Sequence, residues 1–535
     1  MHLYEEYGPD CVEHLHGMFA FALWDRRRRR LMLARDRVGK KPLYYHATPA
    51  GGMSFASELR ALIEDREVPR RVDAGAIDSF LAYGYVPSPN SIFSDVRKLP
   101  PAHTLLFEDG RVSLRRYWRL DFSRKLAVKD PRDLHEPIRA AILDATRRRM
   151  VADVSVGAFL SGGIDSSAVV AAMAQTSSAP VKTFSIGFDQ DAFNELPHAR
   201  RVSEQFGTDH QEFVVRPDAI SIVPEIVRHY GEPYADASAI PSFYLAEMTR
   251  RHVTVALNGD GGDESFAGYS RYVANGLASR LERLPMSMRR AAASAGGHLG
   301  GADVSSRANQ ARRLLQGLPM DAAQRYRRYV SWFDDEQRDR LYTDEFAGVA
   351  RACAHPDQLD LAWRQASGGH VVDIMLEVDI ATYLPGDLIT KVDIATMAHS
   401  LEARSPLLDH EVMELAASIP ADLKVRGGEK KWILREALRE WLPSDVLDRP
   451  KQGFSVPVGE WFRHELRDLA RDVLLDGDSL ARGYFRPEVV GSMLDRHFAG
   501  THDEGKRLWS LFMLELWHRE FTDSAPRAGA LEIAA

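Results

Sequence analysis

The alternation of apolar and polar positions divides the chain into two regions. Up to about Trp118, short apolar runs alternate with small or polar residues, and prolines and glycines separate them. This pattern predicts a domain of short strands and turns over residues 1–120. A helix is expected to begin within residues 58–62. The predicted strands are residues 17–24, 31–35, 41–45 and 53–57.

The second region has a different pattern. Residues 121–133 are polar and are expected to form a linker. Apolar β-rich runs then alternate with segments of helical spacing, which predicts a parallel sheet covered by helices. From about Tyr272 to Phe521 the pattern is mainly helical. We expect an α/β domain over residues 134–525 with a helical C-terminal part, then a disordered tail at 526–535. The predicted strands are residues 154–160, 181–188, 211–215 and 253–257, and the predicted helices are residues 134–150, 167–174 and 199–205.

Bulk composition narrows the class of protein. A chain of 535 residues is too long for a single core. The net charge of −7 gives no general affinity for nucleic acid, and the basic run Arg26–Arg30 is interpreted as a solvated hairpin turn. Two cysteines, no apolar run of membrane-span length and no signal-peptide pattern favour a cytoplasmic protein without a membrane partner.

The segment Ser-Gly-Gly-Ile-Asp-Ser-Ser at 161–167 lies between a predicted strand and a predicted helix. Two glycines allow backbone amides to converge, and the helix N-terminus adds to an anion site. Asp165 can hold magnesium beside phosphates. The lysine of a Walker A loop is absent, so the segment suits a departing pyrophosphate better than γ-phosphate transfer. The alternative is an ordinary glycine turn before a helix.

A second glycine-rich loop, Asn258–Glu264, follows the predicted strand at 253–257. Its three carboxylates would repel one another without a cation. Its place at the end of a buried strand favours a binding site over a surface turn.

Segment 161–167 resembles the fingerprint of the ATP-pyrophosphatase superfamily, whose members cleave ATP between the α- and β-phosphates and adenylate a substrate. Five further segments are similar to the asparagine synthetase family: residues 232–241, 258–264, 388–409, 428–435 and 449–457. The resemblance extends over nearly the whole chain. Residues 17–25, 33–45 and 55–59 look like the end of a class II glutamine amidotransferase domain. The implied fold is a parallel-sheet, adenine-nucleotide α-hydrolase-like synthetase domain, preceded by an incomplete α+β, Ntn-type glutaminase domain.

The resemblance also implies roles for individual residues. Asp165 and Asp263 hold Mg²⁺, Asp260 acts near the acyl centre, and Lys451 offsets charge in the transition state. The implied ATP- and pyrophosphate-binding residues are Leu160, Ser161, Gly162, Gly163, Asp165, Ser166, Ser167, Ile186, Asn258, Gly259 and Lys431. The substrate-side candidates are Glu232, Asp236, Lys391, Asp393, Glu402, Arg404 and Asp409. The implied small molecules are ATP, aspartate, and glutamine or ammonia, and the implied assembly is a homodimer.

The sequence departs from the family at its N-terminus. The family's glutaminase has a catalytic cysteine directly after the initiator methionine, where this chain has His2. Cys11 is internal and has no free α-amine, so it is not expected to replace that nucleophile. Either the start codon was assigned too late or the glutaminase was lost. A β-sandwich that lacks its early strands would expose unpaired strand edges, which favours the late start. A polypeptide with these ends is expected not to hydrolyse glutamine. Asn258 replaces the family's usual serine.

The predicted reaction is ATP-dependent amidation of the aspartate side chain through β-aspartyl-AMP, giving asparagine, AMP and pyrophosphate. Two alternatives stay open. The same adenylation can act on another carboxylate, such as a sugar acid or a peptide in exopolysaccharide biosynthesis, or close a β-lactam. The chain can also be a non-catalytic binding protein with a relic fold.

Overall fold

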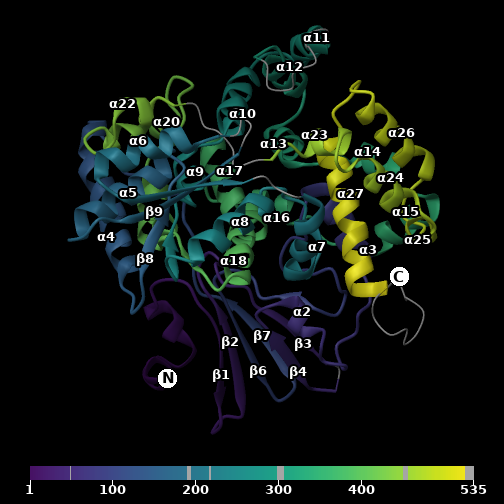
Figure 1. Cartoon of the computed structure of the whole chain (residues 1–535), viewed down its shortest axis with the longest axis horizontal. Helices are drawn as coiled ribbons and strands as arrows, with labels where there is room; N and C mark the ends of the chain where they lie inside the picture. The colour runs from purple at the N-terminus through teal and green to yellow at the C-terminus, as the bar shows by residue number, and fades with distance from the viewer. Residues whose placement is uncertain (49, 189–193, 216–218, 298–306, 450–455, 524–535) are drawn as a thin grey trace.

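The computed structural model describes residues 1–48, 50–188, 194–215, 219–297, 307–449 and 456–523. Lys451 and the tail predicted at 526–535 lie outside these ranges. Figure 1 shows the N-terminal strands at the bottom, a parallel sheet with its helices on the left, and C-terminal helices on the right.

The N-terminal part contains two antiparallel sheets, and the four predicted strands are confirmed. The first has the order β1-β2-β6-β7 and the second β4-β3-β5. The strands are β1 (Ala20–Asp25), β2 (Arg30–Arg35), β3 (Tyr44–Ala47), β4 (Met53–Ala56), β5 (Arg97–Lys98), β6 (His103–Glu108) and β7 (Arg111–Arg116). The helical segments are α1 (His2–Tyr7), η1 (Gly8–His14), α2 (Leu59–Leu62) and α3 (Ala74–Tyr83).

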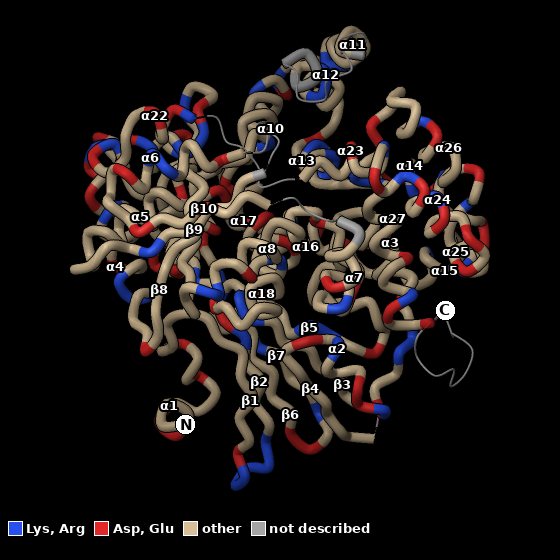
Figure 2. The backbone as a smooth tube through the Cα atoms, viewed as in Figure 1, with Lys and Arg blue, Asp and Glu red and all other residues tan. Residues whose placement is uncertain are grey.

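Two local features of this part bear on the predictions. The basic run forms the exposed turn between β1 and β2, where Asp25 pairs with Arg30, so the predicted hairpin is confirmed (Figure 2). Helix α3 was missed, because only strands and turns were expected there. Asp73 caps this helix by accepting a hydrogen bond from the Ala76 amide. Nearly all of its residues are buried, so the sequence shows no amphipathic period.

The predicted parallel sheet is confirmed, with the order β10-β9-β8-β11-β12. Its strands are β8 (Val156–Phe159), β9 (Lys182–Phe188), β10 (Asp209–Val215), β11 (Val255–Leu257) and β12 (Glu402–Arg404). The helices of this region are α4 (His135–Met150), α5 (Ile164–Thr176), α6 (Leu196–Phe206), α7 (Ala219–Tyr230) and α8 (Ala239–Arg250), with η2 (Pro131–Leu134) before them. Val255 and Leu257 pack towards α4 and α5, whereas Ala256 packs with α8, so helices cover both faces. Strand β12 was missed, because a helix and loop were expected there.

The remaining chain is mainly helical, as predicted. Its segments are α9 (Gly262–Phe266), α10 (Ser270–Leu281), α11 (Met286–Gly297), α12 (Arg307–Gly317), α13 (Ala322–Val330), α14 (Asp335–Leu341), α15 (Asp344–Ala352), α16 (Gln358–Gln365), α17 (Val371–Ala381), η4 (Leu384–Leu388), α18 (Ile389–Ala398), η5 (Pro406–Leu408), α19 (His410–Ser418), α20 (Ala421–Lys424), α21 (Trp432–Leu438), α22 (Ser444–Leu447), α23 (Val458–Arg463), α24 (Arg467–Leu475), α25 (Gly477–Ala481), α26 (Pro487–Phe498), α27 (Gly505–His518) and η6 (Arg519–Asp523). Among the helices that the structure describes, none has both the length and the apolar character needed to cross a bilayer.

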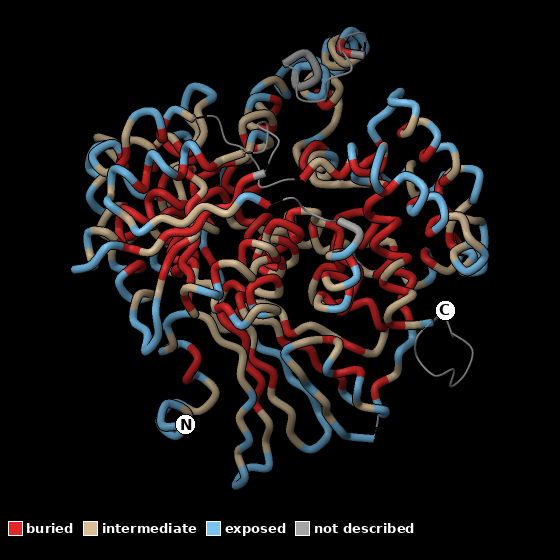
Figure 3. Tube along the Cα trace, viewed as in Figure 1, coloured by how far each residue is buried: buried red, intermediate tan, exposed pale blue. Residues whose placement is uncertain are grey.

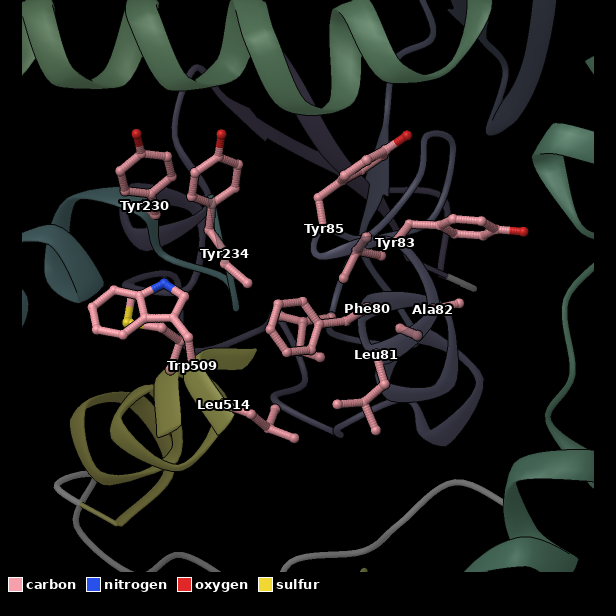
Figure 4. Packing of buried hydrophobic residues seen from close by; sticks show 14 of the residues in the cluster. Phe80, Leu81, Ala82, Tyr83, Tyr85, Tyr230, Tyr234, Trp509 and Leu514 are labelled. Atoms are coloured by element: carbon pink, nitrogen blue, oxygen red, sulfur yellow. The ribbon is translucent and has the colours of Figure 1, made fainter. Parts of the chain in front are cut away.

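One large core joins the N-terminal part to the rest of the molecule (Figure 3). Phe80 from α3, Tyr234 and Trp509 from α27 belong to the same buried cluster (Figure 4). The stretch expected as a linker also contributes, because Phe122 is buried in this cluster. Lys125 beside it lies 2.9 Å from Asp373, measured from Nζ to Oδ1.

Candidate active site

The first glycine-rich loop follows β8, and α5 begins directly after it. Gly162 has φ +70°, and a Cβ there would lie 2.6 Å from the Ala199 backbone nitrogen. Glycine is therefore required where the loop passes α6. The Oγ atoms of Ser161 and Ser166 lie 3.0 Å apart, and Ser166 also donates to the Gly163 carbonyl at 3.2 Å. The loop thus holds its own shape while the N-terminus of α5 faces a cavity.

The second glycine-rich loop touches the first. A Cβ at Gly259 would lie 2.6 Å from the Ser166 nitrogen, and one at Gly262 would lie 2.5 Å from the Asp165 carboxyl carbon. Asn258 stabilises the turn, because its Oδ1 accepts a hydrogen bond from the Asp260 amide at 3.3 Å. Glycines are therefore needed here for the close approach of two loops that lie far apart in sequence.

Asp165 and Asp263 meet at the ammonium group of Lys431. The Lys431 Nζ lies 2.7 Å from Asp263 Oδ1 and also pairs with Asp165 Oδ2. Lys431 has φ +53°, a rare conformation for a residue with a side chain, where α21 begins. The two carboxylates are therefore close enough to share one cation. The other Asp165 oxygen is buried and has no hydrogen bond within the described part of the chain. These hard oxygen donors fit Mg²⁺.

A cavity of about 590 Å³ lies beside these two loops. The predicted residues that line it are Leu160, Ser161, Gly163, Asp165, Ser166, Ile186, Asp236, Asn258, Gly259, Asp260, Asp263, Lys391 and Lys431. Gly162 and Ser167 are outside the lining: Gly162 backs onto α6 and Ser167 is buried within α5. Its apolar lining includes Leu160 and a cluster of four side chains, Ile186, Phe159, Phe184 and Leu245. Its polar lining includes the carboxylates of Asp165, Asp260 and Asp263.

Asp236 and Lys391 form an ion pair in another part of the cavity wall, with 2.8 Å between Oδ2 and Nζ. Burial opposes the charge of Lys391, but Asp236 and Asp387 together keep the pKa of its ammonium group above the usual value. Asp260 contributes to the same field. This wall therefore carries both an acidic and a basic group.

Comparisons with known proteins agree with this geometry. The family model for asparagine synthase matches residues 137–519, and the model for a glutamine amidotransferase domain matches residues 1–118. The chain belongs to the asparagine synthase family. The predictions of family, fold class and ligase class are thereby confirmed.

Individual relatives match most of the chain. An asparagine synthetase (glutamine-hydrolysing) of Bacillus subtilis is 32% identical over 518 residues, which cover 96% of this chain and 79% of the relative. A putative asparagine synthetase (glutamine-hydrolysing) of Mycobacterium tuberculosis is 34% identical over 528 residues, covering 97% and 79%. The amidase chry2 of Gibberella zeae is 26% identical over 500 residues, covering 86% and 72%.

Five substrate-side candidates lie outside the cavity lining of this asparagine synthase family member. Glu232 pairs with Lys98, and Asp393 pairs with Lys41. The other three support local structure. Arg404 donates to the backbone of Arg149 and Val151, Glu402 pairs with Arg404, and Asp409 caps α19 and pairs with Arg149.

Several lining residues were not predicted. Arg449 donates to the Ser161 carbonyl at 3.2 Å and to Glu195 at 3.0 Å, so it fixes the first glycine-rich loop. Tyr269, whose hydroxyl donates to Glu264, also lines the cavity. Arg449 stood within a segment of family resemblance, and that was the one signal available for it. The remaining unpredicted lining residues include Ser185, Tyr383, Lys430, Arg435 and Lys506.

The N-terminal part, which matches the glutamine amidotransferase model, places Cys11 in a core. The Cys11 side chain packs with Val12, Met32 and Ala34. Burial raises the pKa of its thiol. This shift is opposite to the one that activates a nucleophilic cysteine.

Proposed function

We propose that the protein uses ATP to amidate the side-chain carboxylate of aspartate, giving asparagine, AMP and pyrophosphate. The observation that carries this proposal is that Asp165 and Asp263 both contact the Lys431 ammonium group beside the first glycine-rich loop. Asparagine synthesis is the activity that the names of the relatives support.

ATP is proposed to lie along this loop, with its adenine beside the apolar lining, near Leu160, Ile186 and Asn258. Backbone amides at the start of α5 receive the phosphates that leave as pyrophosphate. Asp165 and Asp263 would hold Mg²⁺, which supplies positive charge to the leaving group when bound. The buried Asp165 oxygen and the all-oxygen donor pair support this assignment.

The chemistry then proceeds in two steps. The aspartate side-chain carboxylate attacks the α-phosphate, which forms β-aspartyl-AMP and releases pyrophosphate. Ammonia attacks the acyl carbon, AMP leaves, and Asp260 accepts a proton from the new amide nitrogen. Lys451 lies outside the described residues, so its role is assigned from the family resemblance alone. In that role it offsets the negative charge that develops in the transition state.

The nitrogen source is the finer part of the proposal. The glutamine-hydrolysing relatives are named for glutamine. Cys11 is buried and its thiol pKa is raised, so for a polypeptide that consists of residues 1–535 we propose ammonia as the nitrogen source. Glutamate release from glutamine by that polypeptide would contradict this.

The test is release of pyrophosphate from ATP with ammonia present, measured with and without aspartate. We expect release to require aspartate. Asp165→Ala and Lys451→Ala should each reduce it by roughly a hundredfold or more, the scale of removing one preorganised charge. Normal turnover in a folded Asp165→Ala protein would remove the site assignment, and release that requires a different carboxylate would change the acceptor.

A further inference from the structure

Helix α18 carries a basic and an acidic residue on opposite faces. Lys391 faces the cavity, where it pairs with Asp236. Asp393 instead pairs with Lys41 of the N-terminal part, with 2.6 Å between Oδ1 and Nζ. Residues two apart in a helix point about 200° apart. A shift of Asp393 therefore moves Lys391 on the other side of the same rigid element.

The segment from residue 230 to residue 238 repeats this arrangement. Glu232 pairs with Lys98 of the N-terminal part, and its Oε1 also accepts a hydrogen bond from the Tyr44 hydroxyl at 3.3 Å. Asp236, four residues later, faces the cavity. Lys391 and Asp236, which form the ion pair in the cavity wall, thus both come from segments that make ion pairs with the N-terminal part on the side away from the cavity.

These two segments are also joined to each other. Tyr230 donates to the backbone carbonyl of Lys391 at 3.2 Å, and Tyr234 donates to that of Asp387 at 3.1 Å. The two rings stack with their centroids 4.2 Å apart, and their hydroxyls point the same way (Figure 4). A displacement of one segment is therefore expected to be transmitted to the other through these contacts.

The ion pairs from the N-terminal part are not of the exposed, weak kind. Burial raises the pKa of both Glu232 and Asp393, while Lys98 and Lys41 act in the opposite direction. A buried carboxylate is costly without its partner, whereas an exposed pair contributes little. The lysines therefore fix where these two acids lie.

We propose that Lys41 and Lys98 are positioning residues for amide synthesis, which hold Lys391 and Asp236 in place for the acceptor substrate. The acidic and basic groups of that pair match the ammonium and carboxylate groups of an amino acid. This inference rests on the proposed function. It connects the glutamine amidotransferase-like part to the acceptor site through contacts that need no glutamine.

The experiment uses the full chain with ammonia as the nitrogen source, so glutamine hydrolysis does not enter. Pyrophosphate release is measured against aspartate and ATP concentration for Lys41→Met and Lys98→Met. We expect KM for aspartate to rise roughly tenfold, the scale of altered coupling between packed elements, while KM for ATP changes less than about twofold. In Lys41→Arg, KM for aspartate should stay close to the wild-type value, because arginine keeps the positive charge.

Arg30→Met is the matched control. It breaks a 2.7 Å ion pair with Glu108 inside the N-terminal sheet, where no synthetase element takes part, so both KM values should stay unchanged. Asp393→Asn keeps the side-chain size and replaces Lys41→Met if that variant fails to fold. Hydrogen exchange of the α18 amides, measured without substrate, should accelerate in Lys41→Met and not in Arg30→Met.

Two results would overturn the inference: unchanged KM for aspartate in the folded lysine variants, or equal increases in KM for aspartate and ATP. Failure of the proposed function is a separate result, in which the wild-type protein releases no aspartate-dependent pyrophosphate. The exchange rates of α18 still decide the positioning role in that case, and unchanged rates would refute it.

Discussion

Lys431 illustrates how a single side chain can stand where a metal is expected. Its ammonium group lies between Asp165 and Asp263, and all three side chains are largely buried. Without a cation there, two carboxylates at this separation would repel each other. Lysine and a bound Mg²⁺ would therefore meet the same electrostatic need and compete for the two carboxylates, and the lysine offsets one of their two negative charges.

This competition predicts how Lys431→Met responds to metal. The variant should be less stable than the wild type in a chelator, because its two acids lose their shared partner. Added Mg²⁺ should then raise its thermal midpoint more than that of the wild type, since a ligand that binds the native state stabilises it. Thermal unfolding with and without Mg²⁺ measures both effects. Equal shifts in the two proteins would show that the metal binds elsewhere.

Lys40 predicts a pH dependence of stability. Burial, followed by the charge of Arg149, lowers the pKa of Lys40 from 10.5 to about 7, and its Nζ donates to the Ser405 carbonyl at 3.0 Å. Between about pH 7 and 10.5 the unfolded chain binds this proton and the native protein does not. The free energy of unfolding therefore rises with pH across that window, because the cost of burying the charged ammonium group disappears. Below the window the full cost remains.

Lys40→Met should remove that rise. Urea unfolding at several pH values between 7 and 10 should give a flatter profile for the variant than for the wild type. Between pH 7 and 10 the difference is at most about 4 kcal/mol, from about 1.4 kcal/mol per pH unit. Identical profiles would mean that Lys40 stays protonated in the native state.

At the scale of elements, strands and loops were easier to predict than buried helices and the residues that line the cavity. Strand β8, its loop and α5 followed from local pattern, because glycines and buried strands leave strong signals. Helix α3 was missed because it is buried on nearly every side. Asp393 was predicted to face the substrate with Lys391, but only one face of α18 lines the cavity. A spacing of two residues changes sides on a helix, and the sequence does not state which side faces inward.

The far wall of the cavity could not be predicted for a different reason. Tyr269, Tyr383 and Lys506 reach it from segments that are distant in sequence. Their positions in the cavity depend on how α10, η4 and α27 pack against one another, and this packing cannot be predicted from a local sequence pattern. The family resemblance supplied the two glycine-rich loops and also Asp236, Lys391 and Lys431, whereas the three residues of the far wall became visible only in the folded structure.

The two adjacent glycines of the first loop give a matched comparison. Gly162 has positive φ and no room for a Cβ, whereas the nearest atom to a Cβ at Gly163 is Ser161 Oγ at 3.3 Å. Gly162→Ala should destabilise the protein by at least about 1–2 kcal/mol, the cost of a left-handed conformation, with the clash added. Gly163→Ala should stay close to the wild type. Thermal unfolding without nucleotide compares them, and equal midpoints would contradict the loop geometry.

At the scale of the whole molecule, the N-terminal part is not a separate body. Helix α3 packs with α27, and the two belong to one buried cluster that also contains Tyr230 and Tyr234 (Figure 4). Contacts such as Lys40–Ser405 cross the same boundary. Because this cluster takes side chains from both parts, the elements that contribute to it should lose stability cooperatively when it is disrupted.

Phe80→Ala tests this cooperativity. Phe80 is fully buried in α3, so its loss should cost about 3–5 kcal/mol. Hydrogen exchange should accelerate both in α2 of the N-terminal part and in α17, which contribute side chains to this cluster although neither contains the substitution. Phe55→Ala is the control, because this side chain is 40% exposed and its removal should cost less than about 1 kcal/mol. If Phe80→Ala left α17 protected while α2 opened, the shared cluster would not couple the two parts, since a substitution in a common cluster must lower the stability of every element that depends on it.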